Sequence, residues 1–131
     1  MKEKLFAEAK IAMERAYAPY SNFKVGAALL TEKGIIYTGC NIENSSYSLT
    51  CCAERVAIFS AIAQNERKFK QFVVVANTAD PISPCGACRQ VMNEFLSRSM
   101  PIHLANIHGE MMETTVEQLL PYSFRLHKTD Q

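Results

Sequence analysis

The compact run from Phe72 to Ala76 most constrains the fold of this chain, because it is apolar throughout and rich in valine. A run of this kind is typical of a strand that is covered on both faces. Strand-like and helix-like segments alternate along the rest of the chain, and this order predicts an α/β layered fold. We therefore expect a sheet with helices packed on it and this run among its covered strands.

The spacing of apolar residues predicts where the other elements lie. Helices are expected at about 3–17, 51–64, 86–98 and 115–120, the last stopped by Pro121. Strands are expected at 24–31, 35–40, 72–76, 102–107 and 111–114. The first two strands flank the turn Glu32-Lys33-Gly34. The pattern predicts a three-layer α/β/α fold with a mixed sheet of roughly five strands and a hairpin at one edge.

Length and composition narrow the class of protein. With 131 residues, 48% of them hydrophobic, we expect residues 1–131 to form a single domain with one core. The net charge is +1 without a lysine or arginine run, which argues against a nucleic acid polymer as partner. The chain shows neither a secretion signal nor an apolar run of membrane-spanning length, so we expect a soluble, cytoplasmic protein without a membrane partner.

The five cysteines are an odd number, which fits a disulfide framework poorly and favours metal binding in a reducing compartment. Two stretches contain the candidate metal ligands, Cys52-Ala53-Glu54 and Pro84-Cys85-Gly86-Ala87-Cys88. Both fall at predicted helix starts, where the helix dipoles favour thiolates. Three thiolates, from Cys52, Cys85 and Cys88, predict a Zn²⁺ site that keeps its fourth position for water.

Cys51 leaves an alternative open. It could replace Cys52 as a ligand, or join the other three in a closed structural zinc site without chemistry. A chain of this length with a full apolar core does not need a zinc staple, which favours the open site. Cys40 is expected to be a small buried hydrophobe.

Glu54 is the predicted catalytic residue. It is too close to Cys52 to be an obvious fourth ligand, and an unligated carboxylate beside an activated water can move its proton. Alone it would be an ordinary glutamate at a helix start. Three thiolates on Zn²⁺ leave a formal charge of −1, which calls for a positive group nearby. Arg55 is our candidate for that role, and Arg89 is the alternative.

These residues resemble the zinc-dependent nucleoside deaminases, whose signature combines a glutamate near the first ligand with P-C-x-x-C. More specifically, the chain is similar to small cytidine deaminases of the homotetrameric type, which carry cysteine at the position of Cys52. The similarity extends from about Tyr17 to Phe124. Four blocks match in order, namely 20–28, 39–44, 52–55 and 84–90.

The resemblance implies hydrolytic deamination of cytidine and 2′-deoxycytidine to uridine and 2′-deoxyuridine, with release of ammonia, in pyrimidine salvage. It also implies that Asn41 and Glu43 hold the ribose hydroxyls. Residues i and i+2 of an extended segment face the same side, which agrees with that role. Phe23 would line the sugar pocket, and backbone groups near Ala53 and Cys85 would orient the base.

The resemblance further implies a homotetramer in which Phe124 reaches a neighbouring subunit's pocket and packs on the base. The apolar stretch 119–124 agrees with this, since a monomer would expose it or fold it back. Tyr47 is expected at the same interface.

Three other functions remain open. The chain could act on a modified cytosine nucleoside such as blasticidin S, although Asn41 and Glu43 favour a plain ribose. An editing deaminase for nucleic acid would need a basic face that the sequence lacks. A structural zinc module would have no activity on cytidine.

Overall fold

The computed structural model describes residues 1–126, so the end of the predicted single domain, 127–131, lies outside the described residues. One sheet has the strand order β2-β1-β3-β4-β5. The strands are β1 (Val25–Thr31), β2 (Ile36–Cys40), β3 (Phe69–Ala76), β4 (Ile102–Asn106) and β5 (Met111–Thr114). The helices are α1 (Lys2–Glu14), α2 (Ala53–Ala63), α3 (Gly86–Phe95) and α4 (Val116–Leu119), with a 3₁₀ turn η1 (Tyr47–Leu49).

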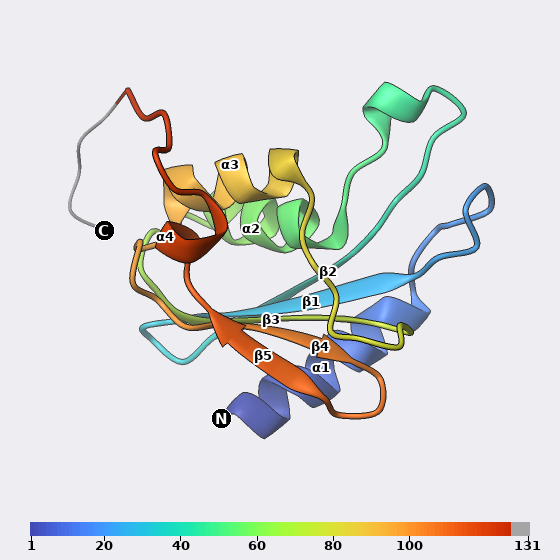
Figure 1. The fold of residues 1–131 in the computed structure, drawn as a ribbon, viewed down its shortest axis with the longest axis horizontal. Coiled ribbons are helices and arrows are strands. Elements are labelled where there is room, and N and C mark those ends of the chain that lie inside the picture. Colours follow the sequence, from blue (N-terminus) through green and yellow to red (C-terminus); the bar gives the residue numbers. More distant parts are fainter. Residues whose placement is uncertain (127–131) are drawn as a thin grey trace.

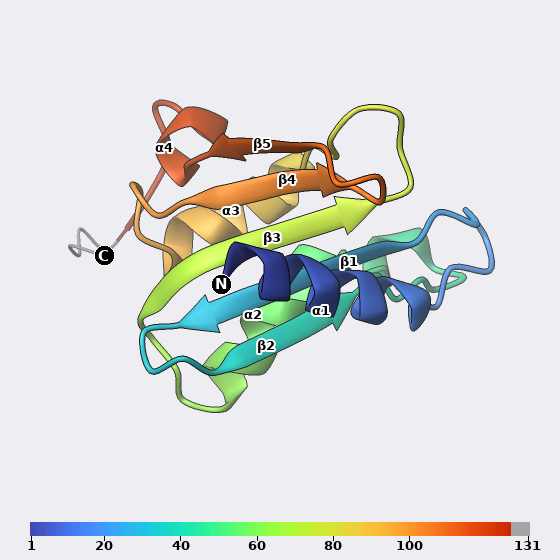
Figure 2. The same cartoon turned by 90° about the horizontal axis from the view of Figure 1, so that it is seen from below.

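The sheet is mixed, as predicted. Strands β3 and β4 run parallel, whereas the β1–β2, β1–β3 and β4–β5 pairs are antiparallel. The hairpin of β1 and β2 forms one edge of the sheet (Figure 2). Helix α1 covers one face, and α2 and α3 cover the other (Figure 1). The three-layer α/β/α prediction is therefore confirmed.

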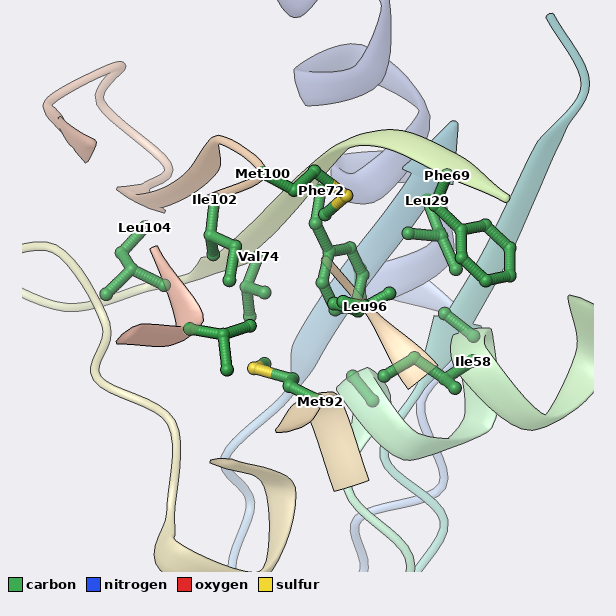
Figure 3. Close-up of a cluster of buried hydrophobic side chains, with 14 of the residues drawn as sticks. Leu29, Ile58, Phe69, Phe72, Val74, Met92, Leu96, Met100, Ile102 and Leu104 are labelled. Atoms are coloured by element: carbon green, nitrogen blue, oxygen red, sulfur yellow. The ribbon is translucent and has the colours of Figure 1, made fainter. Parts of the chain in front are cut away.

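The apolar run from Phe72 to Ala76 lies in β3 and is buried on both faces. Phe72 and Val74 belong to the core cluster under α2 and α3, and Val73 and Val75 to the cluster under α1. Figure 3 shows the first cluster, in which side chains from the sheet, α2 and α3 form one apolar layer. Alternating burial on two sides is what a strand of period two requires.

Several predicted boundaries are wrong by a few residues. Helix α1 ends at Glu14, because Tyr17 leaves the helix and forms a bridge with Ile42. Strand β3 begins at Phe69, where it pairs with Thr31, and α3 ends at Phe95. These ends depend on contacts between distant segments, which local periodicity does not contain.

The segment 51–64 is apolar on almost every face, which predicts a helix buried all round. The structure differs on the outer face of α2, where Phe59 is 45% exposed. None of the helices within residues 1–126 is both long and apolar enough to cross a membrane.

Candidate active site

Three cysteine sulfurs gather at the N-terminal ends of α2 and α3. Cys52 is the N-cap of α2, Cys85 is the N-cap of α3, and Cys88 lies in the first turn of α3. The Sγ atoms of Cys52 and Cys85 are 3.9 Å apart, those of Cys85 and Cys88 are 3.4 Å apart, and all three lie within 4.8 Å of one another. Sulfurs that share one tetrahedral zinc at about 2.3 Å are about 3.8 Å apart. The donor set therefore fits Zn²⁺.

The described residues supply this cluster with three ligand atoms, and Cys51 is not a member. Its backbone pairs with that of Ile42 in both directions, at 2.9 Å, which keeps Cys51 in the extended segment before α2. Cys40 is half-buried in β2 and likewise outside the cluster. Three protein ligands leave the fourth zinc position for water, so the geometry favours the open site over the closed one.

Arg55 supplies the positive charge beside the sulfurs. Its Nη2 donates to Cys52 Sγ at 3.4 Å, and its Nε is buried without a hydrogen-bond partner in residues 1–126. A hydrogen bond from the Cys88 thiol lowers the pKa of Cys52 to about 5, and Arg55 acts in the same direction. The guanidinium of Arg55 thus stands where it can offset the formal charge of −1 that three thiolates on Zn²⁺ would leave.

Arg89, the alternative to Arg55, faces other partners. Its guanidinium donates to the backbone oxygens of Pro84 at 2.9 Å and Leu119 at 2.8 Å, and to Ser83 Oγ at 2.8 Å. Arg89 therefore ties the loop before Cys85 to the end of α4. The structure thus separates two arginines that both lie close to a ligand in sequence, Arg55 three residues after Cys52 and Arg89 directly after Cys88.

Glu54 lies in the first turn of α2 and is only 4% exposed. Burial raises the pKa of its carboxyl to about 7. A carboxyl in such surroundings can hold a proton and release it near neutral pH.

A cavity of about 250 Å³ brings most of the predicted site residues together. Seven of them line it: Phe23, Asn41, Glu43, Cys52, Ala53, Glu54 and Cys85. The sequence analysis assigned no role to the other five lining residues, Ser21, Val25, Thr50, Ile82 and Ser83. Cavities for small molecules usually start at about 300 Å³. At about 250 Å³ this cavity lies just below that range, so it has room for no more than one small ligand.

The side chain of Asn41 is hydrogen-bonded to the backbone at the start of β1. The side chain of Asn41 accepts from Val25 N at 2.8 Å and donates to Phe23 O at 2.8 Å. Each end of the amide therefore has one hydrogen bond within the protein and capacity for another. Asn41 is buried, so that capacity is directed at the cavity it lines.

A family model described as the cytidine and deoxycytidylate deaminase zinc-binding region matches residues 1–104. The chain belongs to this family.

Relatives in the family are similar over most of the chain. The cytidine deaminase of Sporosarcina psychrophila is 61% identical over 122 residues, which cover 93% of this chain and 90% of the relative. The cytidine deaminase of Halalkalibacterium halodurans is 49% identical over 123 residues, 94% of this chain and 93% of the relative. A crystal structure of cytidine deaminase from Burkholderia pseudomallei, 50% identical, matches with a TM-score of 0.93 over 95% of this chain and 99% of that chain. The deaminase fold and the zinc-binding region are thus shown for this chain.

Of the predicted substrate-binding residues, Phe124 is the one that does not line the cavity. The residue is 69% exposed, while its backbone oxygen accepts from Gln90 Nε2 at 3.1 Å and Asn93 Nδ2 at 3.3 Å on α3. The segment after α4 runs beside α3 in Figure 1. Tyr47, in the projecting η1 segment, is 77% exposed.

Of the lining residues without an assigned role, Ser21 has the clearest sequence signal. It stands in the block 20–28 that carries the family resemblance, two residues before Phe23. The pattern does not show its partner, because that partner, Glu43, follows 22 residues later in the chain.

Proposed function

We propose that this chain catalyses the hydrolytic deamination of cytidine and 2′-deoxycytidine to uridine and 2′-deoxyuridine, with release of ammonia. The observation that carries the proposal is the buried Glu54 beside a three-cysteine cluster, in a cavity that also presents Asn41 and Glu43. The 61% identity to a protein named cytidine deaminase supports it.

Cys52, Cys85 and Cys88 would hold Zn²⁺, which when bound supplies a Lewis acid that makes water a nucleophile near neutral pH. Glu54 accepts a proton from the attacking water and delivers one to N3 of the cytosine ring. The same carboxylate then takes the proton of the hydroxyl newly bonded to C4 and passes it to the departing amino group, so that water and cytidine become uridine and ammonia. Its depth in the cavity shields these transfers from bulk solvent.

The other lining residues hold the nucleoside. The first turn of α2 leaves backbone N–H groups without helical partners, and those near Ala53 face the base. Asn41 and Glu43 receive the sugar hydroxyls, and Phe23 provides an apolar wall. Arg55 offsets the extra thiolate charge through its contact with Cys52.

We further propose that four copies associate and that Phe124 enters the cavity of a neighbouring copy. Exposed aromatic and aliphatic side chains on one chain support this, because such surface is normally covered. They include Tyr47, Leu49, Phe59 and Phe124. Light scattering of the purified protein measures the mass, and a monomer with full activity would refute this part.

The proposal also includes a single domain over 1–131, a cytoplasmic location and a role in pyrimidine salvage. All five cysteines are free thiols, which supports a reducing compartment.

The decisive test follows the absorbance of cytidine with the wild-type protein and with Glu54→Gln. The variant should keep its zinc and lose turnover, because an amide cannot accept the proton. Full turnover by Glu54→Gln would refute the mechanism. A wild-type protein that binds zinc and leaves cytidine unchanged would point to a structural zinc module. A preference for blasticidin S over cytidine would instead favour the modified-nucleoside alternative.

A further inference from the structure

The carboxylate of Glu43 is held by the loop between α1 and β1. Its Oε1 accepts from the backbone N–H groups of Tyr20 at 3.0 Å and Ser21 at 3.1 Å. Its Oε2 accepts from the hydroxyl of Ser21. A carboxylate offers about four lone-pair positions, so three donors leave one of them open, on Oε2. The loop therefore fixes where Glu43 can accept a further hydrogen bond.

Ser21 also connects this carboxylate to the rest of the sugar site. Its Oγ accepts from Phe23 N at 3.0 Å while its hydroxyl proton goes to Glu43. Phe23 in turn accepts, through its backbone oxygen, the Asn41 hydrogen bond. The turn between them depends on Asn22, which has a positive φ of 57°. The Ser21 hydroxyl thus contacts Glu43 directly and is connected to Asn41 through the backbone of Phe23.

Ser21 and Glu43 line the same cavity as Glu54, whereas Phe124 is not among its lining residues. The Ser21 hydroxyl, together with the two backbone N–H groups, lowers the pKa of Glu43 below its ordinary value. The carboxylate is thus kept in the form that can only accept. A partner at the open position must therefore be a donor, and the donors of a nucleoside's sugar are its hydroxyls.

We propose that Ser21 is a positioning residue for sugar specificity: it aims Glu43 at a hydroxyl common to cytidine and 2′-deoxycytidine, which is the 3′ or the 5′ hydroxyl. This inference rests on the proposed function. It goes beyond that function by naming a residue outside the metal cluster that selects among cytosine nucleosides. Ser21 acts through Glu43 and touches no reacting atom.

The test compares kcat and KM of the wild type and Ser21→Ala on cytidine, 3′-deoxycytidine and 5′-deoxycytidine. Without the Ser21 hydroxyl, Glu43 is no longer aimed at the sugar and loses its hydrogen bond to the nucleoside. Loss of that one hydrogen bond to a charged group should raise the KM for cytidine by about ten-fold, with kcat within about two-fold of wild type. For the analogue without the selected hydroxyl, Ser21→Ala should leave KM unchanged, because the contact is already absent. Ser21→Thr keeps the hydroxyl and should restore the wild-type KM.

Ser45→Ala is the matched control. The Ser45 hydroxyl bonds that of Tyr20 at 2.6 Å, so it joins the same two loops without contacting Glu43 in the described residues. This variant should keep the wild-type KM on all three nucleosides. In the Glu43→Gln background, adding Ser21→Ala should change KM no further.

Two results would overturn the inference. One is a folded Ser21→Ala protein with wild-type KM for cytidine, and the other is an equal rise in KM on all three nucleosides, which would mean general loop support. Both are distinct from failure of the proposed function, in which the wild type itself would leave cytidine unchanged.

Discussion

Gly39 in β2 lies directly against α2, the helix that begins with Cys52 and Glu54. A Cβ added at Gly39 would lie 2.4 Å from Ala57 N and 2.5 Å from Ala53 O, both backbone atoms of α2. Ordinary contact begins at 3.4 Å, so Gly39→Ala must push α2 away by about 1 Å. We predict that this one methyl group damages both stability and catalysis.

The magnitudes follow from this displacement. Overpacking of this kind costs about 1–3 kcal/mol of unfolding free energy. A misplacement of about 1 Å at a catalytic group lowers the rate by about a hundred-fold. Cys52 and Glu54 come from the N-terminal end of α2, whereas Cys85 and Cys88 come from α3. A shift of α2 therefore changes the geometry of the cluster, and kcat/KM for cytidine should fall far more than the loss of folded protein explains.

Gly26→Ala provides the matched control. Its Cβ would lie 2.0 Å from Ala9 O and 2.6 Å from Met13 N, in α1 on the opposite face of the sheet. Gly26→Ala should lower the free energy of unfolding at least as much as Gly39→Ala does. It should nevertheless leave kcat/KM of the folded protein near the wild-type value. Urea unfolding, zinc content and kcat/KM would be measured for both variants at one temperature where both are folded. Equal kcat/KM for the two variants would refute the reasoning.

Three further predictions follow from individual contacts. Arg55→Met should release zinc to a chelator more readily than Arg55→Lys, because only the lysine keeps a positive charge near Cys52; equal release rates would contradict this. Arg89→Met should keep its zinc yet make the chain beyond Leu119 more sensitive to limited proteolysis, since a bond to that backbone is lost; unchanged cleavage would count against it. Burial lowers the pKa of His103 below its ordinary 6.5, although Glu113, 3.8 Å away, opposes the shift. The unfolded chain therefore takes up a proton first, so the unfolding free energy should fall from about pH 7 to pH 5.5, and fall less in His103→Gln; parallel pH profiles would contradict this.

The inner parts of the elements could be predicted from the sequence because they repeat a local period. Helix α2 and strand β5 lie where the pattern expected them. The ends of α1 and β3 could not be predicted, because they depend on the Tyr17–Ile42 bridge and on pairing with Thr31. The exposed outer face of α2 was missed for a related reason, since apolar composition does not say what covers a surface.

The cysteine spacing and the glutamate beside the first cysteine determined the chemistry from the sequence alone. The reason is local, since a helix start fixes the direction of Cys85 and Cys88 over one turn, and Glu54 follows Cys52 by two residues. The tertiary structure alone decided which guanidinium meets the sulfurs and which group orients Glu43. Those contacts depend on rotamers and on loops brought together by the sheet, and a short distance along the sequence to a ligand does not determine where a side chain points.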